Sequence, residues 1–380
     1  MESLTQLIDH EFPVNHKMAY LNHAGVGPWP ARTAEAVCRF AEENINQGAI
    51  GYEAWVRIEQ ELKHKFCQIL NCPSIDDIAL VKNTSEGLSL IAYGLSWEPG
   101  DNIVITDQEF PSNRIVWESL SRFGVETRPA RLQGPDLATD SILQLIDERT
   151  RLVSISSVQY ASGLVMDLQR IGQFCRQHAI LFCVDAIQSL GALPLDVQQI
   201  NADFIVADGH KWMLGPEGIG VFYSNTEARN RLNLTQYGWH MTEQPGNFDL
   251  LQWQEARSAR RFECGSPNML GIHALNASLS LLLEAGIDSI SREIIRKSGN
   301  IIDYIKNNKI IRLLSPEAKG HYAGIVTFVH NNLPAQEILT RLAEHQIVAA
   351  VRGGGIRLSP HFYTSDERIE HTLQVIDRLK

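Results

Sequence analysis

Through the middle of the chain, short apolar runs alternate with longer stretches in which apolar positions recur at helical spacing. The apolar runs predict six strands, at Ile78–Val81, Asn102–Thr106, Leu152–Ser156, Leu181–Val184, Phe204–Ala207 and Gly220–Tyr223. The periodic stretches predict six helices, at Ala31–Gln47, Tyr52–Leu70, Ser85–Gly94, Ser112–Phe123, Ser141–Asp147 and Leu168–His178. Regular alternation of strands and helices is typical of parallel α/β units, so we predict an α/β fold.

The pattern changes after about residue 250, where the helical stretches lengthen. Residues 269–307 predict one long helix. The remaining pattern predicts a strand near 324–329, a helix near 334–345, strands near 347–351 and 356–359, and a closing helix from about 365 to 379. We therefore predict a large α/β domain over residues 15–255 and a smaller α+β domain over residues 256–380, which the N-terminal segment 1–14 joins.

Composition narrows the range of partners. The 380 residues carry a net charge of −10, which disfavours nucleic acid because phosphate binding requires a basic face. No run approaches the roughly 18 apolar residues of a membrane span, and no secretory signal is visible, so we expect no membrane partner. The six cysteines include no C-x-x-C pair, and their spacing indicates neither a metal site nor a disulfide framework. We expect a reducing, cytoplasmic setting.

Two predicted strands end in residues that carry chemistry. Asp185 follows the run Leu181–Val184, and Lys211 follows the run that begins at Phe204. Open α/β sheets bind ligands beyond the carboxyl ends of their strands. A carboxylate and an amine placed there suit pyridoxal phosphate, because the amine can form a Schiff base while the carboxylate keeps the ring nitrogen protonated. Each residue alone has an ordinary alternative, a helix cap for Asp185 and a solvated surface charge for Lys211.

Four further segments fall at predicted strand ends. Thr84 and Ser85 open a helix whose N-terminus could bind phosphate or be capped by them. Phe110 could stack on a flat cofactor or pack in the core. Gln188 could reach the ligand of Asp185 or face solvent, and Arg357 could bind a substrate carboxylate or form an internal salt bridge.

Together these segments resemble the class V aminotransferase family of fold-type I pyridoxal-phosphate enzymes. The most specific match is Val-Asp-Ala-Ile-Gln at 184–188 followed by Asp-Gly-His-Lys-Trp at 208–212, and the likeness extends from Tyr20-Leu21-Asn22-His23 to Arg357-Leu358-Ser359. The family includes cysteine desulfurases, cystine lyases, kynureninases and isopenicillin N epimerases. The resemblance implies a large domain with a mainly parallel seven-stranded sheet and a smaller C-terminal α+β domain.

The resemblance implies roles around the cofactor ring. Lys211 would hold the ring as a Schiff base and later move the Cα proton of the substrate. Asp185 would pair with the pyridine nitrogen, Gln188 would hydrogen-bond the ring hydroxyl, and Phe110 would stack on the ring face.

The resemblance also implies the phosphate site and the assembly. Thr84 and Ser85 would bind the phosphate, with His210 nearby. Ser266 matches a residue that reaches the phosphate of the partner subunit. The working unit would therefore be a homodimer with its active sites at the interface.

Amino-acid recognition completes the implied site. Arg357 would grip the α-carboxylate of the substrate, helped by the backbone near His23 and Ala24. Either Gln159 or Tyr160 would lie on the hydroxyl side of the cofactor, and the sequence does not decide between them. Trp239, His240 and Arg352 either shape the side-chain pocket or are structural.

Two positions depart from the family pattern. Asp208 stands where many relatives carry Ser or Thr facing the phosphate, so we expect this carboxylate to turn away or bond to backbone. Cysteine desulfurases carry a nucleophilic cysteine just before the terminal arginine, whereas no cysteine follows Cys264 here. Persulfide relay from the loop at 352–356 is therefore not available.

These observations predict a pyridoxal-phosphate enzyme that acts on an α-amino acid. An aminotransferase or a cysteine desulfurase-like protein without the desulfurase cysteine is the first expectation. A C–S lyase or an epimerase comes next, and the alternative outside enzymology is a catalytically silent α/β binding protein. A nicotinamide dehydrogenase is disfavoured because no G-x-G-x-x-G follows an early strand.

Overall fold

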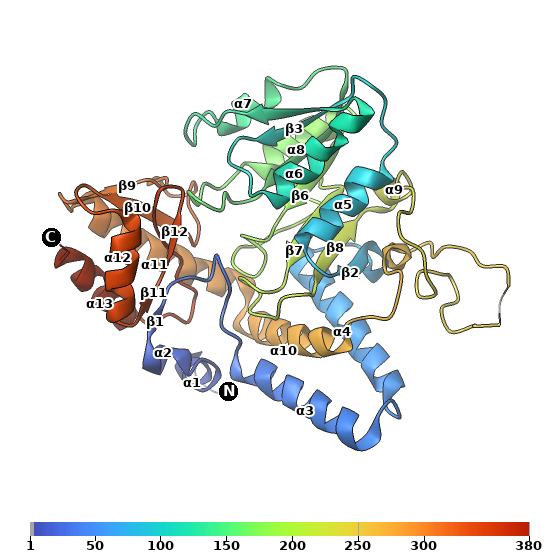
Figure 1. Cartoon of the computed structure of the whole chain (residues 1–380), viewed down its shortest axis with the longest axis horizontal. Coiled ribbons are helices and arrows are strands. Elements are labelled where there is room, and N and C mark those ends of the chain that lie inside the picture. The colour runs from blue at the N-terminus through green and yellow to red at the C-terminus, as the bar shows by residue number, and fades with distance from the viewer. Residues whose placement is uncertain (1–3, 250, 380) are drawn as a thin grey trace.

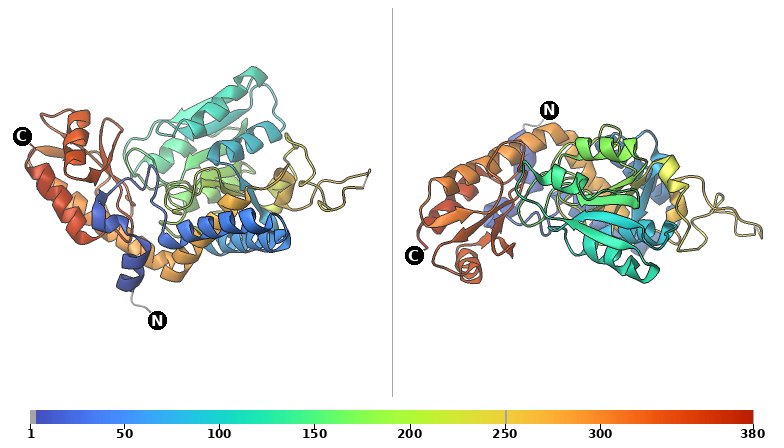
Figure 2. Two further views of the ribbon diagram at one scale, coloured as in Figure 1. Left: turned by 60° about the horizontal axis from the view of Figure 1, so that its bottom comes forward. Right: turned by 90° about the horizontal axis from the view of Figure 1, so that it is seen from above.

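The computed structural model describes residues 4–249 and 251–379, and side chains from residue 8 onward. A larger body surrounds one sheet, and a smaller body carries the C-terminus (Figure 1). The two bodies lie side by side in the further views of Figure 2 as well. Helices α1 (Leu4–Glu11) and α2 (Val14–Lys17) begin the described chain next to the smaller body.

The large sheet has seven strands, which confirms the predicted α/β fold. Their spatial order is β2 (Ile78–Val81), β8 (Gly220–Ser224), β7 (Phe204–Asp208), β6 (Leu181–Asp185), β5 (Thr150–Ser156), β3 (Asn102–Thr106) and β4 (Glu126–Ala130). Only β8 runs antiparallel to its neighbours. The pattern missed β4, because this edge strand is half exposed and contains Pro129, so it lacks a continuous apolar run.

Helices cover both faces of this sheet and form two separate cores. One core joins α4 (Tyr52–Leu70), α8 (Leu168–Gln177) and α10 (Met269–Ala285) to one sheet face. The other joins α5 (Thr84–Gly94) and α6 (Ser112–Glu118) to the opposite face. Successive side chains of a strand point to opposite faces, which is why Val104 lies in the first core and Ile103 and Ile105 in the second. Helix α7 (Ala138–Leu143) begins earlier than predicted.

The smaller body contains a four-stranded antiparallel sheet. Its order is β12 (Ala350–Arg352), β13 (Gly355–Leu358), β10 (Val326–His330) and β9 (Ile311–Leu313). Helices α11 (Ile287–Lys306), α12 (Ala335–Glu344) and α13 (Asp366–Asp377) pack around it. The N-terminal segment joins through β1 (Ala19–Tyr20), which pairs in parallel with β11 (Ile347–Val348).

The single helix predicted over residues 269–307 is wrong, because α10 and α11 are separate and bent by 81°. The break lies at Gly286, whose φ of +79° is a conformation that glycine adopts without a steric penalty. Helix α10 packs against α4 and α3 (Ala31–Gln47) of the large body. The domain boundary near residue 255 stays a prediction, and this packing favours a boundary at Gly286. No single helix among the described residues is long and apolar enough to cross a membrane.

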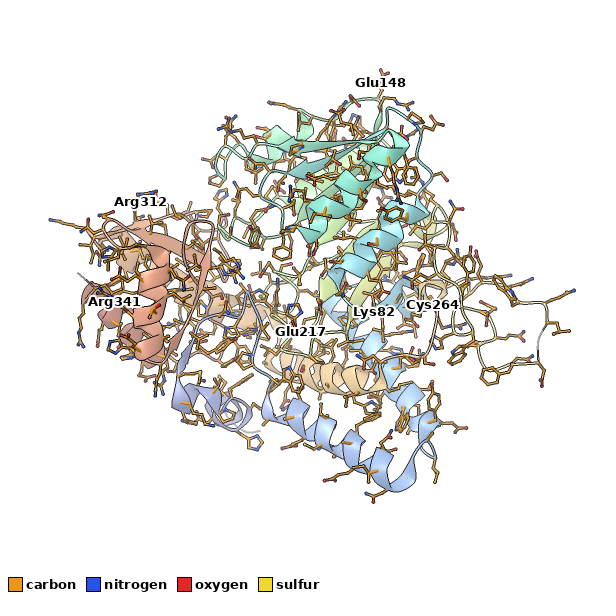
Figure 3. All side chains as sticks on the ribbon, in the orientation of Figure 1. Lys82, Glu148, Glu217, Cys264, Arg312 and Arg341 are labelled. Atoms are coloured by element: carbon orange, nitrogen blue, oxygen red, sulfur yellow. A yellow bond between two sulfur atoms is a disulfide. The ribbon has the colours of Figure 1, made fainter. Side chains whose placement is uncertain are left out.

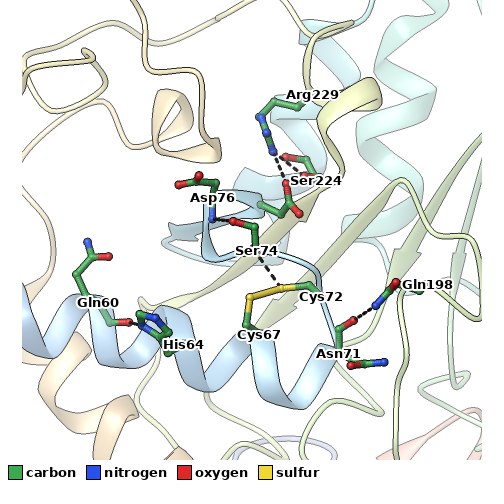
Figure 4. Close-up of a disulfide and its surroundings, with 11 residues drawn as sticks. Gln60, His64, Cys67, Asn71, Cys72, Ser74, Asp76, Gln198, Ser224 and Arg229 are labelled. Atoms are coloured by element: carbon green, nitrogen blue, oxygen red, sulfur yellow. Dashed lines mark hydrogen bonds and ion pairs between the residues drawn. A yellow bond between two sulfur atoms is a disulfide. The ribbon is translucent and has the colours of Figure 1, made fainter.

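The expectation that the cysteines form no disulfide is wrong for one pair. Cys67 and Cys72 are joined at the end of α4, with their Cα atoms 4.9 Å apart (Figure 4). The helix ends at Asn71, which adopts a left-handed conformation, and the amide of Cys72 donates to the carbonyl of Cys67. This turn folds the chain back, so a spacing that indicates no known framework still brings the two sulfur atoms together.

Candidate active site

A cavity of about 400 Å³ opens at the carboxyl ends of β6 and β7, where the small body meets the large sheet. It collects side chains from separate parts of the chain because the strand ends of an open sheet share one edge. Ten predicted site residues line it: Ala24, Thr84, Ser85, Phe110, Tyr160, Asp185, Gln188, His210, Lys211 and Arg357. His23 and Ser266 do not line it.

Asp185 is the last residue of β6 and is almost completely buried. Its Oδ1 accepts a hydrogen bond of 3.0 Å from the amide of Ile187. Burial raises the pKa of Asp185 to about 7, and the nearby charges of Glu109 and Asp208 add to the effect. Lys211 and the Ile187 amide oppose it. A carboxyl group in this state can share a proton with a basic ring nitrogen near neutral pH.

Lys211 lies three residues after the end of β7, and its side chain is buried beside the cavity. Its Nζ lies 5.5 Å from the centre of the Phe110 ring. The pKa of Lys211 is lowered to about 8, mainly by burial and also by the charges of Arg357 and Arg352, while Asp185 and Asp208 oppose the change. The neutral amine is therefore accessible near neutral pH, as a nucleophile or base requires.

The N-terminus of α5 provides the predicted phosphate site. Asn83 caps this helix, since its side chain accepts from the amide of Glu86. Thr84 and Ser85 are therefore not the capping residues. The hydroxyl of Ser85 donates to Ser112, whereas the buried hydroxyl of Thr84 has no partner in the described structure. Free donors at a helix N-terminus suit an anion.

Asp208 corrects one expectation. Asp208 lines the cavity, and one of its oxygens is buried without a hydrogen-bond partner among the described residues, so the expected bond from this oxygen to backbone is not formed. The Nδ1 atom of His210 lies 3.1 Å from this carboxylate, but the two groups are not aligned as a hydrogen bond. The structure therefore places the imidazole of His210 beside the carboxylate of Asp208 at the cavity, a contact that sequence spacing did not reveal.

Gln188 is buried rather than solvent-facing. Its Nε2 donates to the carbonyl of Ala24, at 3.1 Å, and its Oε1 accepts from the indole of Trp212, at 2.9 Å. These bonds fix the amide at the cavity wall and leave one N–H free. His23 is part of the core instead, since its Nδ1 donates to the carbonyl of Ser359 and its Nε2 accepts from the hydroxyl of Tyr363.

Arg357 faces the cavity from β13 and is 2% exposed. Its guanidinium donates to the carbonyl of Tyr160, at 2.8 Å, and to Asn22, at 3.3 Å, while its Nε has no partner in the described chain. Both partners are neutral, so the internal salt bridge is not formed. Burial, assisted by Arg352, lowers the pKa of Arg357 to about 10. An unpaired buried guanidinium is costly, and an anionic ligand would relieve that cost.

Tyr160 and Gln159, the two residues expected near the hydroxyl of the cofactor, differ in position. Tyr160 lines the cavity, and its ring lies edge-on to Phe110 with centroids 5.2 Å apart. Gln159 lies behind the wall, where its amide donates to Thr106 and Glu109. The sequence interpretation also missed Glu109, a buried carboxylate directly before Phe110. The signal that could have revealed it was an acidic residue shortly after an apolar strand.

Four other predicted residues lie apart from the cavity or at its edge. Arg352 lines it. Trp239 belongs to a recess lined by residues within 237–248 and by Trp253, and the ring of His240 lies 3.7 Å from Glu263. Ser266 lines a different recess together with Lys82 and Cys264, which Figure 3 labels.

Comparison with known proteins identifies the family. Residues 19–369 match the family described as Aminotransferase class-V. The chain belongs to the class-V aminotransferases. A probable cysteine desulfurase of Methanothermobacter thermautotrophicus is 29% identical over 96% of both chains. The uncharacterized aminotransferase YcbU of Bacillus subtilis is 26% identical over 99% of this chain and 98% of its own.

Solved structures of pyridoxal-phosphate enzymes superpose on this class-V aminotransferase over nearly its whole length. The cystine C–S lyase C-DES, in complex with its product cysteine persulfide, superposes with a TM-score of 0.89 at 26% identity, covering 97% of this chain and 99% of that one. A C-DES variant with glycine covalently linked to its pyridoxal-phosphate cofactor superposes equally well, with 97% and 98% covered. The chain is therefore a pyridoxal-phosphate-dependent enzyme of this family.

The site residues fit this cofactor. The unpartnered hydroxyl of Thr84 at a helix N-terminus suits its phosphate, and the buried carboxyl of Asp185 suits its ring nitrogen. Lys211 lines the same cavity of about 400 Å³, and its Nζ lies over the ring of Phe110. When bound, the cofactor supplies an electron sink for charge that develops at the substrate Cα.

Proposed function

We propose that this enzyme removes the Cα proton of an α-amino acid and completes a β-elimination that breaks a carbon–sulfur bond. One observation carries the proposal: a single cavity holds the buried amine of Lys211, the carboxyl of Asp185 and the unpaired guanidinium of Arg357. The amine supplies a base, the carboxyl fixes the electron sink, and the guanidinium fixes the substrate carboxylate.

The residue roles follow from this arrangement. Arg357 binds the α-carboxylate through its free N–H groups, which orients the Cα–H bond in the cavity. Lys211, with its lowered pKa of about 8, accepts the Cα proton as a neutral amine. Phe110 and Tyr160 place two aromatic rings on the cavity wall, edge-on to each other, where a flat ring can pack against them.

The loop next to Arg357 favours elimination with release of the sulfur product over transfer of sulfur to the protein. The loop at 352–356 contains no cysteine, so sulfur is not transferred to a protein thiol there. Among the structures compared, C-DES cleaves cystine at carbon and sulfur. Arg352 adds a second guanidinium to the cavity, which suits a substrate with two carboxylates, such as cystine. Cystine and water would then give pyruvate, ammonia and cysteine persulfide as the sulfur leaves with the bonding pair.

Transamination is the second candidate, because a curated relative is named as an aminotransferase. Purified enzyme with added cofactor, supplied with cystine, cysteine and alanine in turn, distinguishes the two. Elimination gives pyruvate from cystine in large excess over enzyme. Transamination converts the cofactor to its amine form in one turnover, which would overturn the elimination proposal. A Lys211→Arg variant must lose either reaction, and retained turnover would overturn the role of Lys211.

We propose a homodimer in which Ser266 of each subunit reaches the phosphate site of the other. Residues 237–249 and 251–253 support this, since they project from the large body in Figure 1 and expose Tyr237, Phe248 and Trp253 by 65%, 78% and 53%. Exposed aromatic side chains of this size commonly mark an interface. Light scattering should give twice the chain mass, and a monomer would overturn the proposal. We also propose a cytoplasmic setting, which the free thiols support and the Cys67–Cys72 disulfide opposes.

A further inference from the structure

Glu109 is a buried carboxylate behind the cofactor cavity, at the end of β3. Its Oε1 accepts from the hydroxyl of Thr106, at 2.7 Å, and from the amide of Gln159, at 3.3 Å. Its Oε2 accepts from the amide of Asn113, at 2.9 Å, and from the hydroxyl of Ser156, at 2.5 Å. The backbone N–H of Ser156 lies 3.0 and 3.1 Å from the two oxygens.

The donors around Glu109 suit a carboxylate that carries its charge. A backbone N–H can only donate, and the indole of Trp117 donates to Asn113 Oδ1, so the Asn113 amide must turn its NH₂ toward Glu109. Every partner of Glu109 in the described part of the chain is neutral. Neutral donors satisfy the oxygens but leave the negative charge uncompensated.

This charge lies next to Asp185 in the sheet. Ser156, which binds Glu109 through both its amide and its hydroxyl, is the register partner of Asp185 on the neighbouring strand. The next residue, Ser157, donates its backbone N–H to the carbonyl of Asp185 at 2.9 Å. Neighbouring strands lie about 4.8 Å apart, so the two carboxylates belong to one buried cluster.

Three charged groups act on Asp185 from the elements around it. Glu109 and Asp208 repel its negative charge, and Lys211 attracts it. Asp208 has His210 beside it, at 3.1 Å, whereas Glu109 has no cationic partner among the described residues. Of the two repelling carboxylates, Glu109 is therefore the one with no basic side chain beside it among the described residues.

We propose that Glu109 is a positioning residue whose buried negative charge makes Asp185 a stronger partner for the protonated ring nitrogen of the cofactor. A second anion raises the proton affinity of Asp185, and it attracts the positive charge of a protonated ring. The same hydrogen bonds fix the segment that carries Phe110, so charge and ring placement depend on one side chain. Removing the charge while keeping the shape separates the two effects.

The test measures the titration of Asp185 by carbon NMR of the full chain labelled in its aspartate carboxyl groups, without cofactor. The signal is assigned with Asp185→Asn. In the wild type we expect a midpoint well above the ordinary aspartate value of about 3.9. Glu109→Gln should lower the midpoint by about one pH unit, because a neighbouring negative charge is lost. Glu109→Asp, which keeps the charge, should restore most of the shift.

Asp203→Asn is the matched control. Asp203 accepts from the amides of Phe182 and Asn225, but it lies at the opposite end of β7, about 16 Å along the strand from the cavity. The Asp203→Asn substitution should leave the titration midpoint of Asp185 unchanged. A second readout uses the holoenzyme with a cofactor labelled at its ring nitrogen, whose nitrogen NMR signal should show deprotonation at lower pH in Glu109→Gln.

Several outcomes would overturn the inference. A titration midpoint of Asp185 near 4 in the wild type would overturn it. This measurement needs no variant, so the inference can be tested even if Glu109→Gln does not fold. An unchanged Asp185 midpoint in folded Glu109→Gln would also overturn it. So would an Asp185 shift in Asp203→Asn as large as the shift in Glu109→Gln. Because the aspartate titration needs neither cofactor nor substrate, its failure is separate from a failure of the proposed elimination reaction.

Discussion

The buried amine of Lys211 allows a direct test by chemical labelling. Burial and two nearby arginines lower its pKa from 10.5 to about 8. At pH 7 an amine with a pKa of 8 is about 9% neutral, whereas one with a pKa of 10.5 is about 0.03% neutral. Since only the neutral form is nucleophilic, Lys211 should react about 300-fold faster than it would with an unshifted pKa.

The assay uses the cofactor-free protein and a small acylating reagent such as acetic anhydride, with labelled peptides quantified by mass spectrometry from pH 6 to 11. The rate at Lys211 should rise with pH and level off above a midpoint near 8. The peptide of Lys82, whose side chain is 75% exposed, serves as the reference for reagent access.

Two variants check the sign of each charge effect. Asp185→Asn removes an attraction for the ammonium form, so the midpoint of Lys211 should fall. Arg357→Met removes a repulsion, so the midpoint should rise. A wild-type midpoint at 10 or above, or shifts of the opposite sign in the two variants, would refute the reasoning about this site.

Three further predictions concern the substrate site, the packing beside it and the disulfide. Arg357→Lys should raise the KM for the amino acid roughly ten- to hundredfold in steady-state assays, because one ammonium replaces a fixed fork of donors; the spectrum of the bound cofactor should not change. Gly324→Ala would place a methyl group against the Trp212 ring and should cost about 1–3 kcal/mol in urea unfolding, whereas Gly246→Ala, with nothing within 4 Å, should not. Cys67→Ser should lower the free energy of unfolding by about 2 kcal/mol without reductant and have no such effect with it.

Sequence pattern predicted most of the large sheet because its central strands are buried on both faces. Such strands read as continuous apolar runs, and β3 begins and ends at the predicted residues. The edge strand β2 does so too, because it is mostly buried. The edge strand β4 escaped detection because its polar, half-exposed residues resemble a loop. The break at Gly286 was missed because both flanking helices keep an apolar face across it.

The site was predictable where one residue type allows few roles. A lysine and an aspartate that follow adjacent apolar strands specify a narrow chemistry, and the structure places both in one cavity. The position of His23 was not predictable, because its partners Ser359 and Tyr363 lie more than 300 residues further along the chain. The surroundings of Glu109 were not predictable either, because its donors come from three elements, β3, β5 and α6, that meet only in the folded chain.

By itself, the sequence determined most strands of the large sheet, the family and the two residues that define the chemistry, because periodicity and local motifs are properties of neighbouring positions. Tertiary structure alone decided which charges meet. It left Arg357 without an acid, placed Asp208 beside His210, and put the anion of Glu109 behind Asp185. Electrostatic energy depends on distance and burial in space, and neither quantity is encoded in the spacing of residues along the chain.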